Sequence, residues 1–315
     1  MGGIEILFVL KQFLAELLSE KVSLERQIEI IKIFNQHQKN PNVLFLLAQE
    51  LLSQAKLLKQ VPADAIDIVG TGGDGFNTLN FSTLSAFLVA RAGYPVIKHG
   101  NKSATSKTGS FDFLIKLGVS IPETPEEAEK ILKEKGIVFL FAPYFHPLMA
   151  RVKKARDFFA SQGERTIFNL IGPLINPARV KHMCVGVYQE DLVPVFAEVL
   201  VRLGVQYAYI VWGNGLDEFN LMGRHKLIKI QKGKITEENF NPQDYRIKPA
   251  PISDLTGGDI DQNVKEGREL LENKLQGPKK EMLILNTAAA LRVASEFKLS
   301  WEESLRESSR VIGLI

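Results

Sequence analysis

The sequence predicts an α/β fold, with a mostly parallel central sheet flanked by helices and a smaller all-helical domain attached to it. Two observations lead to this prediction. Residues 4–58 carry a helical pattern throughout, whereas from Ala65 onward short β-branched runs alternate with helical stretches. That alternation is typical of parallel strands covered by helices. A chain of 315 residues, 45% of them hydrophobic, has enough apolar material for one large core, or for a large and a small one.

The opening segment, residues 1–62, is predicted to form the small helical domain. Its start, Ile4 to Leu10, is apolar, but charged residues soon interrupt the run, which predicts an amphipathic helix rather than a signal sequence. Ser23 is a candidate N-cap, and Asn40-Pro41 pairs a cap with proline at the first helical position. Helices within about 147–180 are expected to complete this domain.

The larger domain, residues 63–315, is expected to carry the sheet. Its strand candidates are Ile66 to Val69, Pro95 to Lys98, Ile137 to Phe141, Met183 to Val187 and Tyr207 to Trp212. Thr124 and Ser300 each start a capping-box pattern with glutamate three residues later. The lysine-rich residues 226–250 predict a hairpin and a loop. The closing helices are expected over Glu281 to Phe297 and Ser300 to Gly313.

Composition excludes several classes of protein. No run approaches the ~18 apolar residues of a membrane span. The formal charge of +3 is spread along the chain, so it does not by itself indicate nucleic acid or a membrane as partner. One cysteine, Cys184, excludes an intrachain disulfide framework, fits a reducing compartment such as the cytoplasm, and is expected to be packed rather than reactive.

A glycine cluster, Gly70 to Gly75, directly follows the first predicted strand, and Ser82 opens the next helix. Glycines at such a place let backbone N–H groups approach a phosphate, and the helix N-terminus adds its positive end. A dinucleotide site would need an acidic residue ~20 positions further on, but no Asp or Glu occurs from Gly75 to Phe111. The pattern therefore indicates phosphate binding of another kind.

The same acid-free stretch is rich in donors, which suits a ligand with several phosphates. Its basic residues and its hydroxyl and amide side chains include Lys98, Lys102, Thr78, Asn80, Ser82, Thr83, Asn101, Ser106 and Ser110. Lys98 ends an apolar strand, where binding residues of open α/β sheets gather. The segment from Lys98 to Asn101 predicts a second loop beside the first.

Two adjacent carboxylates, Asp217 and Glu218, end the glycine loop that follows the strand Tyr207 to Trp212. Next to a phosphate crevice they predict a Mg²⁺ site, since Mg²⁺ prefers a few hard oxygen ligands together with substrate phosphates. An exposed turn with an acidic helix start is the alternative interpretation.

Basic residues cluster after the aromatic loop Phe141 to Pro147. They are Arg151, Lys153, Lys154 and Arg156. One of them can turn inward while the others face water, and an inward arginine beside aromatic rings would suit a planar carboxylate. Spacing alone does not say which one. His146 is interpreted as a structural turn residue.

These motifs together resemble the signature of the anthranilate phosphoribosyltransferases, from about Asp67 to the C-terminus. The matching segments are Gly70 to Gly75 with Thr78, Asn80 to Thr83, Lys98 to Asn101, Gly109-Ser110, Phe141 to Pro147, Arg165 to Pro177 and Gly215 to Glu218. The resemblance implies a nucleoside phosphorylase/phosphoribosyltransferase-like fold and a homodimer. It also implies transfer of a phosphoribosyl group from phosphoribosyl pyrophosphate to anthranilate, in tryptophan biosynthesis.

The resemblance also implies roles for individual residues. The donor would be bound by Gly70, Gly73, Asp74, Thr78, Asn80, Thr83, Lys98, Ser106 and Ser110. Anthranilate would be met by Gly70, Asn101 and Arg156, with Arg156 on its carboxylate, and Mg²⁺ would be held by Ser82, Asp217 and Glu218. No residue is assigned as a catalytic acid or base, because the aromatic amine is already a competent nucleophile and catalysis would come from positioning and electrostatics.

Two other interpretations remain at this point. The first is another enzyme of the same fold, either a nucleoside phosphorylase or a transferase with another acceptor. The phosphorylase would not need Asp217 and Glu218 as a metal pair, so a requirement for magnesium distinguishes it. A non-catalytic homologue that binds nucleic acid would have damaged donor and metal motifs, which are intact here.

The chain departs from the family at three places. Lys102 stands where arginine is usual, and Phe111 replaces a small residue, so that it either narrows the acceptor path or packs inside. The usual N-terminal pattern is not recognisable among residues 23–60.

Overall fold

The computed structural model describes residues 3–101 and 109–314. Within them, seven strands form one sheet in the order β3-β2-β1-β4-β5-β6-β7. The strands are β1 Ile66–Gly70, β2 Val96–Gly100, β3 Ile137–Phe141, β4 His182–Gly186, β5 Tyr207–Gly213, β6 His225–Gln231 and β7 Lys234–Glu237. Strands β1 to β5 are parallel to one another, β6 is antiparallel to β5, and β7 is antiparallel to β6. The predicted parallel sheet is confirmed, and so is the predicted hairpin, which β6 and β7 form.

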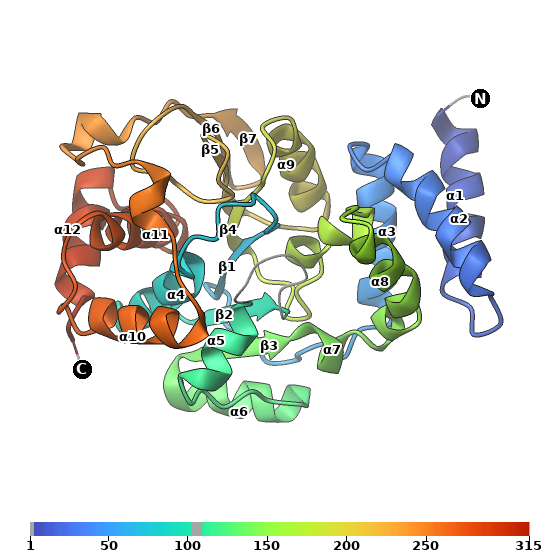
Figure 1. The fold of residues 1–315 in the computed structure, drawn as a ribbon, viewed down its shortest axis with the longest axis horizontal. Helices are drawn as coiled ribbons and strands as arrows, with labels where there is room; N and C mark the ends of the chain where they lie inside the picture. The colour runs from blue at the N-terminus through green and yellow to red at the C-terminus, as the bar shows by residue number, and fades with distance from the viewer. Residues whose placement is uncertain (1–2, 102–108, 315) are drawn as a thin grey trace.

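Helices surround this sheet (Figure 1). The α-helices are α1 Gly3–Leu17, α2 Leu24–Gln36, α3 Pro41–Ser53, α4 Phe81–Arg91, α5 Ser110–Lys116, α6 Pro125–Lys135, α7 Ala142–Phe145, α8 Lys153–Ser161, α9 Leu192–Arg202, α10 Ile260–Leu271, α11 Pro278–Ala294 and α12 Trp301–Val311. Two 3₁₀ turns, η2 Ile167–Asn169 and η3 Gly172–Leu174, lie in the segment that leads into β4. The predicted opening and closing helices are present.

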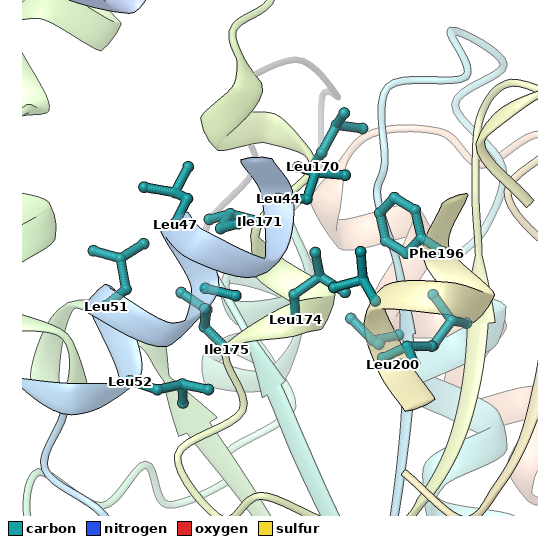
Figure 2. Close-up of a cluster of buried hydrophobic side chains, with 14 of the residues drawn as sticks. Leu44, Leu47, Leu51, Leu52, Leu170, Ile171, Leu174, Ile175, Phe196 and Leu200 are labelled. Carbon is teal, nitrogen blue, oxygen red and sulfur yellow. The ribbon is translucent and has the colours of Figure 1, made fainter. Parts of the chain in front are cut away.

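Two hydrophobic cores lie on the two faces of the sheet. Ile66 and Ile68 of β1 belong to the core with α4, α11 and α12, whereas Val69 belongs to the core with α3 and α9. This division follows from the alternation of side chains along a strand. In the second core, the segment that carries η2 and η3 packs between α3 and α9 (Figure 2), where Leu44, Leu47, Leu51, Leu52, Leu170, Ile171, Leu174, Ile175, Phe196 and Leu200 are labelled.

The N-terminal helices contact the later segment 147–180. The Gln27 side chain of α2 donates a hydrogen bond to the Arg151 carbonyl (3.0 Å). Asn35 binds both ends of one turn, because its side chain accepts from the Ile167 N–H (2.8 Å) and donates to the Arg165 carbonyl (3.4 Å). In Figure 1, α8 lies near α2, and the two helices are in contact. These contacts agree with a helical unit built from both segments, although the division into domains at residue 62 stays a prediction.

Local helix signals are mostly confirmed. Ser23 accepts a hydrogen bond from the Arg26 N–H, and Asn40 accepts one from the Asn42 N–H. The capping box at Ser300 has both of its bonds. At Thr124 the prediction is half wrong: the threonine side chain caps the helix, but the Glu127 carboxylate accepts from the Glu123 N–H instead of the cap residue's own N–H. The loop before α6 therefore turns one residue earlier than a capping box requires.

Candidate active site

Three segments that follow parallel strands start at the carboxyl edge of the sheet. The first follows β1, the second follows β2, which is the neighbour of β1, and the third follows β5. Carboxyl ends of parallel strands are where open α/β sheets bind ligands. Strands β1 and β2, after which the two loops were expected, are confirmed as neighbours. The second loop was placed too early, because Lys98 and Gly100 still belong to β2, and between β2 and α5 the structure describes only Asn101 and Gly109. The third loop contacts the first through Asp217 and Gly72.

Close packing of the first and third loops requires glycine at several positions. A Cβ added to Gly70 would lie 2.2 Å from Asp217 Oδ2, and one added to Gly186, at the end of β4, would lie 1.5 Å from the Asp217 carbonyl oxygen. Gly72 and Gly73 have φ of 65° and 78°, a region that favours glycine. The glycines therefore let the carboxylate loop lie directly on the phosphate loop.

The three residues proposed for the metal come together here. The Gly72 N–H donates to Asp217 Oδ2 (2.6 Å), and the Ser82 N–H, in the first turn of α4, donates to Glu218 Oε1 (3.2 Å). Burial, reinforced by the Asp74 carboxylate, raises the pKa of Asp217 to about 7, and burial together with Asp217 raises that of Glu218. Like charges crowded in this way favour a cation between them.

An unsatisfied oxygen also suits a cation. Glu218 Oε2 is buried and has no hydrogen-bond partner among residues 3–101 and 109–314. A buried polar atom without a partner is costly, and a metal ion would satisfy it. Hard carboxylate and hydroxyl oxygens are also the donors that Mg²⁺ prefers, so the residues fit this ion.

Lys98 reaches the same place from β2. Its side chain is 4% exposed and donates to the Ile68 carbonyl and to Ser82 Oγ, the latter at 3.3 Å. Burial lowers its pKa, while the charges of Asp67, Glu218 and Asp217 oppose that shift. A positive charge is thus placed beside the carboxylates and the helix N-terminus.

The other residues expected to bind the phosphoribosyl donor differ in their burial and in their contacts. Asn80 is the N-cap residue of α4, and its buried Oδ1 has no hydrogen-bond partner in the described part of the chain. Ser110, the first residue of α5, donates to the Asn101 carbonyl (3.2 Å), which holds the second loop to that helix. Thr78 forms a bridge with Thr256, and Thr83 is fully buried, so its side chain does not line an open surface. Ser106 and Lys102 lie outside the described residues.

Arg156 is the inward member of the basic cluster. Its guanidinium lies 6.0 Å from the centre of the Phe168 ring, and burial lowers its pKa. Lys153 and Lys154 are exposed, and Lys153 pairs with Asp157 (2.6 Å). Arg151 binds the Leu18 carbonyl and Glu20. Which basic residue turns inward, a choice that spacing left open, is therefore settled by the packing of α8.

Phe111 packs inside the protein. It is 1% exposed, and its ring lies 4.9 Å from the Phe141 ring. A Cβ on Gly100 would lie 3.1 Å from it. Phe111 therefore packs against Gly100, the last residue of β2, and does not extend into solvent.

Two buried histidines, His99 of β2 and His146, contact each other edge to face. The rings of His99 and His146 lie 5.1 Å apart, and His99 Nδ1 is 3.2 Å from the Gly172 carbonyl oxygen. Burial is the main cause that lowers their pKa values, to about 3 for His99 and about 4 for His146. Both rings are neutral at pH 7, which agrees with a structural role for His146.

Acidification is expected to destabilise the protein through this pair. A histidine in the unfolded chain titrates near pH 6.5, so between about pH 6.5 and 4 the unfolded state binds more protons than the folded state. The stabilisation is fully present above pH 6.5 and is lost as the pH falls, by up to about 1.4 kcal/mol per pH unit for each ring. The free energy of unfolding, measured with urea at pH 7, 6 and 5, should fall less steeply with decreasing pH in His146→Gln than in the unchanged protein. An equal fall in both proteins would contradict this prediction.

Two features of the site were missed by sequence reasoning. Asp67 of β1 is fully buried and accepts hydrogen bonds from Asn176 Nδ2 (2.8 Å) and the His99 N–H (3.4 Å), and burial raises its pKa to about 6. An acid inside an apolar strand was the available signal. The second feature is Arg165, whose guanidinium lies against Gly73 of the phosphate loop. In the sequence, the only indication of a role for Arg165 was that it begins one of the segments that resemble the family, Arg165 to Pro177.

Known proteins are similar to this chain in sequence and in fold. Residues 62–313 match the family model described as "Glycosyl transferase family, a/b domain". The anthranilate phosphoribosyltransferase of Novosphingobium aromaticivorans is 39% identical over 272 residues, which are 84% of this chain and 81% of that protein. A crystal structure of the Thermus thermophilus anthranilate phosphoribosyltransferase is 33% identical with a TM-score of 0.86, and the match covers 99% of this chain and 91% of that one.

One of the similar solved structures contains bound ligands. The Saccharomyces cerevisiae anthranilate phosphoribosyltransferase "in complex with PRPP and Mg" is 27% identical with a TM-score of 0.84, over 96% of this chain and 86% of that one. The Thermus match takes in nearly all of this chain, so the fold is shared even where the N-terminal sequence pattern is not recognisable. From the family model and the curated relative together, this chain belongs to the anthranilate phosphoribosyltransferase family.

Proposed function

We propose that this protein transfers the phosphoribosyl group of phosphoribosyl pyrophosphate to the amino group of anthranilate, giving N-(5-phosphoribosyl)anthranilate and pyrophosphate in tryptophan biosynthesis. The observation that carries the proposal is the contact of the carboxylate loop with the phosphate loop, in which Asp217 binds the Gly72 N–H beside Lys98 and the start of α4. Glycine N–H groups, a helix N-terminus and a lysine suit phosphates, and the carboxylates suit the cation that accompanies them.

The chemistry needs no strong base in this site. The bond between the ribose anomeric carbon and pyrophosphate oxygen breaks, the electron pair leaves with pyrophosphate, and the amine nitrogen bonds to that carbon and loses a proton. Lys98 lies where it can stabilise the leaving group, and the loop N–H groups orient it. Ser82, Asp217 and Glu218 would hold magnesium, which would add positive charge against the departing pyrophosphate.

The acceptor is assigned to Arg156 and Asn101. Arg156, half-buried beside Phe168, offers a planar guanidinium for the carboxylate of anthranilate, and Asn101 follows the second strand with its backbone tied to Ser110. The homodimer implied by the resemblance is part of the same proposal, and light scattering on the purified protein would test it.

The test follows the loss of anthranilate fluorescence with phosphoribosyl pyrophosphate and magnesium, with and without a chelator. Arg156→Ala is expected to lower kcat/KM for anthranilate by about 10–100-fold, the scale of one hydrogen-bonded charge contact. Lys154→Ala is the matched control, because that side chain is exposed on the same helix, and it should keep full activity. No consumption by the unchanged protein would overturn the proposed reaction; equal activity of Arg156→Ala would overturn only its role.

A further inference from the structure

The phosphate loop contacts two side chains of opposite charge. Asp217 lies against Gly70 and Gly72. The Arg165 guanidinium lies against Gly73, where an added Cβ would be 2.7 Å from Arg165 Cζ and from one of its terminal nitrogens. The arginine thus occupies the space that a side chain at Gly73 would fill.

Arg165 is held in place by ring stacking and by backbone hydrogen bonds, neither of which neutralises its charge. The guanidinium lies over the Tyr188 ring, 4.2 Å from the ring centre, and the Tyr188 N–H donates to Thr71 Oγ1 (3.1 Å) of the same loop. Its backbone is fixed as well, since its carbonyl accepts from Asn35 and the capping box of Thr166 and Asn169 follows. Stacking on a ring leaves the edge of the guanidinium, with its N–H groups, available to a ligand.

In the part of the chain that the structure describes, no carboxylate pairs with this arginine. Within residues 3–101 and 109–314, Arg165 has neither a salt bridge nor a side-chain hydrogen bond, although other half-exposed arginines such as Arg26 and Arg151 have both. An arginine that is fixed in position, uncompensated and directed at a phosphate-binding loop matches the planar, bidentate recognition of phosphate oxygens.

We infer that Arg165 is a further binding residue for the phosphoribosyl donor, in contact with oxygens of its diphosphate group. The inference rests on the proposed function. It adds a second positive charge beside the loop, at Gly73, to that of Lys98. Arg156, by contrast, lies beside Phe168 and serves the acceptor.

The experiment measures binding of phosphoribosyl pyrophosphate, and separately of inorganic pyrophosphate, by calorimetry with magnesium and without anthranilate. Arg165→Met keeps most of the side-chain bulk over Tyr188 and removes the charge, and Arg165→Lys keeps the charge without the fork. For both ligands we expect Kd to rise about 10–100-fold in Arg165→Met, as for the loss of one charge-assisted contact, and less in Arg165→Lys. The donor KM should rise in parallel, while the anthranilate KM stays unchanged.

The matched control is Arg202→Met. Arg202 also stacks on an aromatic ring, 4.0 Å from the centre of Phe45, but on α9 and away from the phosphate loop. It should leave donor binding unchanged. Thermal melting of each variant checks folding.

The outcomes separate the inference from the proposed function. If the unchanged protein binds no phosphoribosyl pyrophosphate, the proposed function fails. If it binds and turns over the donor, and Arg165→Met binds both ligands equally well, Arg165 is only a packing residue and the inference alone is overturned. An effect confined to the anthranilate KM would overturn it too, because the arginine would then serve the acceptor.

Discussion

Replacing Asp217 by asparagine or Glu218 by glutamine is expected to remove most magnesium-dependent turnover while leaving the protein folded. The loss in kcat/KM should be on the order of 10²–10³, the scale of losing one preorganised electrostatic contact in a site. Both amides keep the shape of the side chain but not its charge, so the attraction for a cation falls and the packing remains. Steady-state rates over a series of magnesium concentrations measure the effect, which should appear as a raised magnesium requirement.

The same two variants should be at least as stable as the unchanged protein when a chelator is present. Burial and mutual repulsion disfavour the charged forms of these carboxylates, as their raised pKa values show. Removing one charge relieves that repulsion, which is the usual relation between stability and a functional site. Glu237→Gln, an exposed change on β7, serves as control. Full activity of either site variant with a chelator present would exclude the metal role.

Gly186→Ala is expected to damage the site although it leaves every functional side chain intact. Its Cβ would lie 1.5 Å from the Asp217 carbonyl oxygen and 2.3 Å from the carbonyl carbon, which are backbone atoms that cannot rotate away. The carboxylate loop must therefore move. A displacement of about 1 Å can cost roughly 10²-fold in rate, and overpacking typically costs about 1–3 kcal/mol of unfolding free energy.

Kinetics and urea unfolding of Gly186→Ala separate these two effects. Gly172→Ala is the matched change, because nothing lies within 4 Å of a Cβ added there. That variant should stay close to the unchanged protein in stability. Near-normal kcat/KM in Gly186→Ala would contradict the prediction. It would show that turnover does not depend on the close packing of the carboxylate loop against the end of β4.

Much of the fold could be predicted because its signals are local. Each parallel strand was expected within one or two residues of its position, since β-branched runs bounded by turn residues act over a few positions. Caps at Ser23 and Ser300 were expected for the same reason. The Thr124 prediction was half wrong because the second bond of a capping box depends on the path of the preceding loop.

The candidate site was predictable in its members and less so in its geometry. Gly70 to Gly75, Lys98, Asp217 and Glu218 were singled out from residue type and from their places after strands, and the structure brings them together. Thr83 was named with them but is fully buried. Arg165 was not assigned a role, because nothing in its neighbours along the chain indicates that it lies against Gly73.

The sequence by itself determined where strands and helices form, which loops can approach a phosphate, and to which family the motifs are similar. Only the tertiary structure decided that Asp217 meets Gly72 across 145 positions of chain, that Arg156 is the basic residue turned inward, and that Gly186 must lack a side chain. The physical reason is the distance along the chain over which each interaction acts. Propensities and caps act between neighbours, whereas contacts between loops depend on strand order and on the packing of both cores, which the whole chain sets together.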